Sequence, residues 1–143
     1  MNIFTIGFSQ KSAEEFFTLL IKNKVEKLID IRLNNKSQLA GFANAKHLPY
    51  FLKLHNIEYE YNPELAPSKD LLDGYKKKTI NWNEYTDIYN KLLVDRNILN
   101  NISIDEFDNA VLLCSEPTAK QCHRRLLAEY LKSNFNNINI RHL

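Results

Sequence analysis

Short apolar runs alternate with amphipathic stretches along the whole chain. The runs have the length of strands, while the amphipathic stretches repeat their apolar positions at helical spacing. Strands are predicted over residues 2–6, 27–32, 57–61, 109–114 and 137–142. Helices are predicted over residues 12–23, 46–55, from 81 or 83 to 93, and 118–131, while 67–78 fits either a short helix or a loop. This alternation favours a sheet covered by helices.

The predicted fold class is α/β: a single three-layer domain over residues 1–143, with a mostly parallel central sheet flanked by helices. The run Asn109–Cys114 is apolar at nearly every position, as expected for a central strand that is covered on both faces. The segment 33–45 is polar, lacks a clear period and follows the second strand. We therefore expect it to be a loop at the carboxyl edge of the sheet, where functional loops concentrate.

Two helix starts have the spacing of a capping box. Ser12 and Glu15 open the first predicted helix, and each side chain can bind the backbone amide of the other. Thr118 and Gln121 have the same spacing just after Pro117. The spacing predicts that the helix containing Cys122 begins near Thr118.

Composition narrows the function classes. The chain has 143 residues, 44% of them hydrophobic and 25% charged, which fits one globular domain and excludes disordered and low-complexity classes. Its three glycines are scattered singly, which argues against a phosphate-binding loop of the dinucleotide or P-loop type. The net charge of +2 is too small to predict binding of nucleic acid over the whole surface.

The amino terminus lacks the pattern of a signal peptide, and no stretch is long and apolar enough for a membrane span. We therefore expect a cytoplasmic protein with no membrane partner, and the sequence leaves its oligomeric state open. In a reducing compartment its two cysteines are expected to be free thiols, metal ligands or redox groups rather than a structural disulfide.

Candidate chemistry gathers where Cys114-Ser115-Glu116 leads from a strand into the helix carrying Cys122-His123-Arg124. Ligands of open parallel sheets sit beyond the carboxyl ends of the strands, and a helix amino terminus attracts anions. The end of the second strand should bring further charged groups to the same edge, so an anion-binding pocket is predicted there. The candidate catalytic residues are Cys114, Glu116 and Asp30, and the candidate substrate-binding residues are Arg32, Lys36, Ser115, His123 and Arg124.

Three finer expectations follow from this placement. Arg32 should stand within reach of Glu116 across neighbouring strands. Cys114, near a helix start and cations, should be the more reactive thiol. Arg124 should serve the pocket while Arg125 meets solvent, because the two side chains differ by about 100° around the helix.

Other kinds of site fit less well or remain open. A cysteine phosphatase needs an arginine six positions after its cysteine, and Lys120 stands there. A zinc site at Cys114, Cys122 and His123 is disfavoured, because adjacent residues within a helix point about 100° apart, so no metal and no cofactor are expected. Ordinary structural roles stay open, since cysteine is often buried and a helical histidine often makes a structural hydrogen bond.

Several motifs together resemble the bacterial and archaeal family called domain of unknown function 488. They are Thr5-Ile6-Gly7-Phe8-Ser9, Asp30-Ile31-Arg32 with Ser37 and Gly41-Phe42, Ile57-Glu58-Tyr59, and Leu112-Leu113-Cys114-Ser115-Glu116 with Cys122-His123-Arg124. The resemblance implies a compact α/β domain and one pocket shared by these motifs. The chain departs from the family at Phe8, often histidine there, at Leu65-Ala66-Pro67, usually Leu-Gly-Gly, and at Thr118-Ala119, usually Asp-Pro.

Three hypotheses share this pocket. The leading one is an enzyme that acts on a phosphorylated, nucleotide or nucleic-acid substrate, with Cys114 as nucleophile and Glu116 or Asp30 as acid or base. The second is a non-catalytic nucleic-acid-binding module in which Phe42 and Tyr50 offer stacking faces. The third is a redox sensor formed by Cys114 and Cys122.

Overall fold

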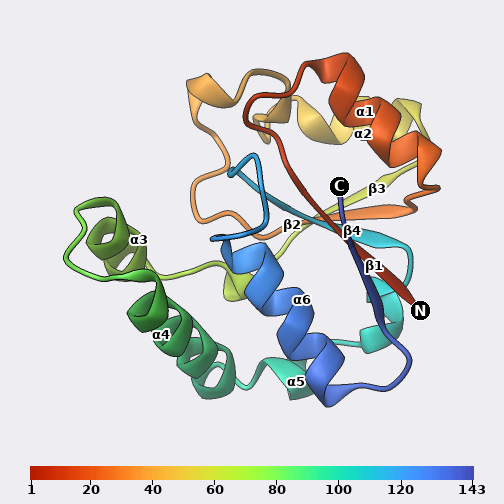
Figure 1. Ribbon diagram of the computed structural model, residues 1–143. Helices are drawn as coiled ribbons and strands as arrows, with labels where there is room; N and C mark the ends of the chain where they lie inside the picture. The colour runs from red at the N-terminus through yellow and green to blue at the C-terminus, as the bar shows by residue number, and fades with distance from the viewer.

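The computed structural model describes residues 1–143 and contains one five-stranded sheet in the order β3-β2-β4-β1-β5 (Figure 1). Every neighbouring pair of strands is parallel. The strands are β1 (Asn2–Gly7), β2 (Lys27–Asp30), β3 (Glu58–Tyr61), β4 (Ala110–Cys114) and β5 (Asn139–His142). The α/β fold class and the five strands expected from the sequence are confirmed, with shifts of a few residues at their ends.

Helices cover both faces of the sheet and make three layers (Figure 1). The α-helices are α1 (Ala13–Lys22), α2 (Leu48–Leu54), α3 (Lys69–Lys76), α4 (Trp82–Asp95), α5 (Ile98–Asn101) and α6 (His123–Asn134). Short 3-10 helices span Gln38–Ala43, Pro63–Leu65 and Ile104–Phe107, the first of them inside the segment that was expected to be a loop. None of the helices has the length and apolar character that a membrane crossing requires.

The central strand β4 explains why its sequence is apolar at every position. All five of its residues are buried. Successive strand residues point to opposite faces, so Leu112 joins the core beneath α4 and α6, while Val111 and Leu113 join the core beneath α1 and α2. The register places Asp30, at the end of β2, beside Leu113 of β4. The residues that follow these two strands therefore emerge next to each other.

The capping box expected at the first helix is present. The Ser12 hydroxyl accepts a hydrogen bond from the Glu15 amide at 3.1 Å, and the Ser12 amide donates to the Glu15 carboxylate at 3.4 Å. Asn81 and Glu84 form the same arrangement at the start of α4, which settles the choice between Asn81 and Asn83.

The predicted start of α6 is wrong. The helix begins at His123 instead of near Thr118, and Cys122 is its N-cap residue in an extended conformation, with φ −141° and ψ 142°. Within the expected first turn, the Gln121 side chain is bound elsewhere, because its Oε1 accepts the Tyr75 hydroxyl at 2.8 Å, and the Lys120 carbonyl accepts the Arg125 guanidinium at 2.6 Å. Residues 115–122 thus form an irregular loop between β4 and α6.

Candidate functional site

The carboxyl edge of the sheet contains a cavity of about 430 Å³. Residues after β4, before and at the start of α6, and after β2 meet around it. The predicted site residues in its lining are Arg32, Cys114, Ser115, Glu116 and His123, together with Cys122. Arg32 and Glu116 therefore face one space, as expected from the adjacency of β2 and β4.

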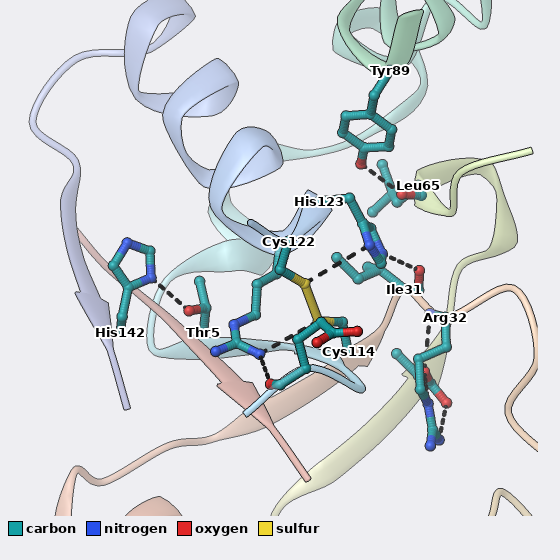
Figure 2. Close-up of a disulfide and its surroundings, with 12 residues drawn as sticks. Thr5, Ile31, Arg32, Leu65, Tyr89, Cys114, Cys122, His123 and His142 are labelled. Atoms are coloured by element: carbon teal, nitrogen blue, oxygen red, sulfur yellow. Dashed lines mark hydrogen bonds and ion pairs between the residues drawn. A yellow bond between two sulfur atoms is a disulfide. The ribbon is translucent and has the colours of Figure 1, made fainter. Parts of the chain in front are cut away.

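Cys114 and Cys122 form a disulfide in the wall of this cavity (Figure 2). The sequence favours free thiols, metal ligands or redox groups over a structural disulfide, and of these the redox pair is the one that agrees with this structure, which has no free cysteine. Cys114 is 1% exposed and Cys122 is 4% exposed, so only a small part of either residue is open to solvent. The irregular loop 115–122 makes the pairing possible, because it turns Cys122 back toward the end of β4.

His123 lies beside the disulfide, and one of its ring nitrogens is hydrogen-bonded to the backbone. Its Nε2 is 2.8 Å from the carbonyl oxygen of Ile31, which can only accept, so Nε2 carries the proton. The other nitrogen, Nδ1, then presents a lone pair and lies 4.0 Å from the Cys122 sulfur (Figure 2). Burial lowers the pKa of His123 to about 4, with the Arg124 charge acting in the same direction. The imidazole is therefore neutral around pH 7.

Arg124 is fully buried behind the disulfide. Its Nη1 donates to the Glu116 carbonyl at 2.6 Å and lies 3.4 Å from the Cys114 sulfur. Burial lowers the pKa of Arg124 to about 10, and the Nε and Nη2 groups have no hydrogen-bond partner. By contrast, Arg125 is partly exposed and pairs with Glu129 at 3.0 Å. Arg125 does not meet solvent alone as expected, because its Nη1 also donates to the Lys120 carbonyl at 2.6 Å, and Arg124 is buried more deeply than a flank position implied.

Gly7 makes this arrangement possible, and sequence reasoning gave it no role. It ends β1 next to Cys114 in the register, and a Cβ atom there would overlap the carbonyl of Glu116 and crowd Nη1 of Arg124. The signal that was available is the presence of Gly7 at the end of the Thr5-Ile6-Gly7 strand motif. A residue with any side chain would displace the loop that follows β4.

Asp30 and Arg32 form a buried ion pair below the cavity. Both are almost fully buried, and the two carboxylate oxygens of Asp30 accept Nε and Nη2 of Arg32 at 2.8 Å each. Tyr59 also donates to this carboxylate at 2.7 Å, and Asn35 donates at 3.3 Å. Burial and the hydrogen bond to Asp30 raise the pKa of Tyr59.

Sequence reasoning gave Tyr59 and Asn35 no role in the site, although Tyr59 belongs to the Ile57-Glu58-Tyr59 motif. The guanidinium of Arg32 lies 5.4 Å from the centre of the Phe8 ring. Its Nη1 is buried and has no hydrogen-bond partner. One donor of this lining residue is therefore left unused by the protein.

Several predicted residues lie outside the cavity lining. Asp30 and Arg124 are buried behind it, and Lys36 is exposed and does not line it. Phe42 packs against Phe16 at a centroid distance of 5.2 Å, and Tyr50 on α2 is 63% exposed. Neither aromatic ring lines the cavity.

Comparison with known proteins identifies a family and nothing more specific. The family model of domain of unknown function DUF488 matches residues 12–131, which is more than half of the chain. The matched range contains both cysteines, His123 and the Asp30–Arg32 pair, and it confirms the resemblance drawn from the motifs. No curated protein and no solved structure matches the chain.

Proposed function

The chain belongs to the family of domain of unknown function DUF488, and on that premise we propose that its cavity is a thiol–disulfide exchange site. In this proposal Cys114 and Cys122 alternate between the disulfide and two thiols. The observation that carries the proposal is the position of the disulfide, in a cavity wall with a guanidinium beside one sulfur and an imidazole beside the other.

The two neighbouring groups would give the cysteines different roles. Arg124 Nη1, 3.4 Å from the Cys114 sulfur, favours the thiolate of Cys114, which makes Cys114 the attacking residue. The lone pair of His123 Nδ1 is on the side of Cys122, so it can accept a hydrogen bond from the Cys122 thiol and orient it. Cys122 is then the resolving residue.

Exchange with a substrate disulfide proceeds in two balanced steps. The Cys114 thiolate attacks one sulfur of the substrate disulfide, which forms a mixed disulfide and releases one substrate thiolate. Cys122 then gives its proton to the substrate thiolate released in the first step and attacks the Cys114 sulfur, which closes the protein disulfide and releases the second substrate thiolate. Two electrons pass from the protein to the substrate, and the reverse sequence oxidises a dithiol. Ser115 and Glu116, which line the cavity, would contact the substrate.

One further observation favours a second candidate, an enzyme acting on an anionic substrate such as a nucleotide. Arg32 lines the cavity, and its buried Nη1 has no hydrogen-bond partner in the protein. This nitrogen could donate to a phosphate or carboxylate oxygen of a substrate. In that case Cys114 is the nucleophile and Glu116 the acid or base. Asp30 would hold Arg32 in place, because its carboxylate is already occupied by Arg32, Tyr59 and Asn35.

The test uses the reduced protein and a chromogenic aromatic disulfide. The Cys122→Ser variant should accumulate a stable mixed disulfide at Cys114, detected by peptide mass spectrometry, whereas Cys114→Ser should form little or none. The wild type should release two equivalents of aromatic thiol and recover its internal disulfide. Equal and slow reaction of both variants would overturn the proposal. Protection of Cys114 by phosphate or nucleotide, without exchange, would support the second candidate instead.

A further inference from the structure

We propose that, once reduced, Cys114, Cys122 and His123 bind one thiophilic divalent cation of the Zn²⁺ type, with a coordination position open to the cavity. The inference rests on the proposed function only in requiring that the disulfide can open. Sulfur and imidazole nitrogen are the ligands that Zn²⁺ prefers in proteins. All three side chains are buried, and each offers one ligand atom to the same small volume.

The distances suit a single ion. The two sulfurs and the histidine nitrogen all lie within 4.8 Å of one another, and Nδ1 is 4.0 Å from the Cys122 sulfur. With Zn–S bonds of about 2.3 Å and a Zn–N bond of about 2.0–2.1 Å, tetrahedral geometry needs about 3.8 Å between sulfurs and about 3.6 Å between sulfur and nitrogen. The Cα atoms of Cys114 and Cys122 are 7.7 Å apart, which leaves room for the sulfurs to separate around an ion.

The orientation of His123 is already that of a metal ligand. Histidines that bind metals usually donate their second ring N–H to a carbonyl or carboxylate, which fixes the ring and leaves the other nitrogen free. His123 makes this hydrogen bond with Nε2 to the Ile31 carbonyl at 2.8 Å. Nδ1, the nitrogen left free, faces the Cys122 sulfur (Figure 2).

The geometry removes the reason for which the sequence disfavoured a metal. The sequence pattern predicts Cys122 and His123 as successive residues inside one helix. In the structure Cys122 precedes the helix in an extended conformation, so its side chain and that of His123 approach one another. This approach is possible because α6 starts at His123 instead of near Thr118.

Charge and access support the same assignment. Two thiolates balance a divalent cation, and the Arg124 Nη1 group, 3.4 Å from the Cys114 sulfur, can donate to a thiolate from behind. Three protein ligands with a fourth position left for water or substrate are typical of catalytic zinc sites rather than closed structural ones. Ser115 and Glu116 line the cavity into which that fourth position would open.

The test is a titration of the reduced protein with Co²⁺, which reports thiolate coordination by its absorption, followed by competition with Zn²⁺. Protein is purified with a non-thiol phosphine reductant, and a thiol count confirms two free cysteines. We expect one equivalent of Co²⁺ with intense thiolate-to-metal bands, displacement by Zn²⁺, and no binding by the oxidised protein. Cys114→Ser, Cys122→Ser and His123→Gln should each weaken or abolish the bands, while His47→Gln, at an exposed histidine, should not.

Circular dichroism of each variant separates loss of a ligand from loss of the fold. Reduced protein that exchanges disulfides but binds no Co²⁺ would overturn this inference and leave the proposed function standing. Bands of equal strength in a folded Cys122→Ser or His123→Gln variant would also overturn it. A disulfide that resists reduction in the folded protein would overturn the inference and the proposed function together.

Discussion

Replacing Arg124 by methionine tests whether the buried guanidinium activates Cys114. Methionine keeps much of the length and apolar volume of the side chain but removes the group that lies 3.4 Å from the Cys114 sulfur and 2.6 Å from the Glu116 carbonyl. Arg124 is fully buried, and two of its three guanidinium nitrogens have no partner. Because a buried charge without full pairing is costly, an apolar replacement should change the free energy of unfolding little.

The effect on reactivity should be larger. A charge-assisted hydrogen bond is worth about 1.5–3 kcal/mol, so its loss lowers the thiolate fraction of Cys114 by about 10- to 150-fold where the thiol form predominates. The thiolate that remains is more nucleophilic, and this recovers a little under half of the change on a logarithmic scale. Alkylation of Cys114 in the reduced variant should therefore slow by about 4- to 15-fold.

The assay is alkylation of the reduced protein with iodoacetamide, followed for each cysteine by peptide mass spectrometry. Arg125→Met is the matched control, because Arg125 pairs with Glu129 and donates to the Lys120 carbonyl of the same loop but contacts neither sulfur. If Cys114 is alkylated at the wild-type rate in Arg124→Met, as is expected for Arg125→Met, the guanidinium does not activate this cysteine. The same conclusion follows if Cys122 slows as much as Cys114, since only the Cys114 sulfur lies beside the guanidinium.

Three further predictions concern stability, each measured by urea unfolding. Gly7→Ala should destabilise the fold by about 1–3 kcal/mol, because the new Cβ overlaps the Glu116 carbonyl; an unchanged unfolding midpoint would refute the close packing. Asp30→Asn should cost about 3–5 kcal/mol, because it leaves the Arg32 charge buried without a counter-charge; a loss under about 1 kcal/mol would show that Arg32 finds another partner. Burial lowers the pKa of His123 to about 4, below the value of about 6.5 in an unfolded chain, so the unfolded state takes up this proton first as pH falls. The histidine should therefore remove about 2 kcal/mol of stability between pH 7 and pH 5, and His123→Gln, which keeps an N–H donor but does not titrate there, should lack this part of the pH dependence; identical pH profiles would contradict the shift.

The strands and the order of helices follow from the sequence because they depend on local patterns. A continuous apolar run such as Ala110–Cys114 is typical of a parallel strand that is covered on both faces, so it predicts a central strand without knowledge of the rest of the fold. The contrast between Arg124 and Arg125 could also be predicted, because the angle between two residues of a helix does not depend on where the helix begins.

The details of the site depend on the path of the loop 115–122, which no local pattern specifies. Thr118 and Gln121 have capping-box spacing, yet the Gln121 side chain accepts the hydroxyl of the distant Tyr75 at 2.8 Å instead of capping a helix. The pairing of Cys114 with Cys122 follows from that path, and so does the lone pair of His123 beside the sulfur. Tertiary contacts between segments far apart in the sequence therefore decide the chemistry of the cavity.

The order of the strands also determines when this site can form during synthesis. β1 and β2 do not pair with each other, and the strand between them is β4, which begins at Ala110. A growing chain therefore has only the β2–β3 pair until residues 110–114 have left the ribosome, and β1 then pairs across more than a hundred residues. Sheets built on such distant contacts fold slowly, because the chain closes a long loop before the pairing stabilises it. Cys114 arrives on that last interior strand, so its thiol is covered only when the sheet is completed.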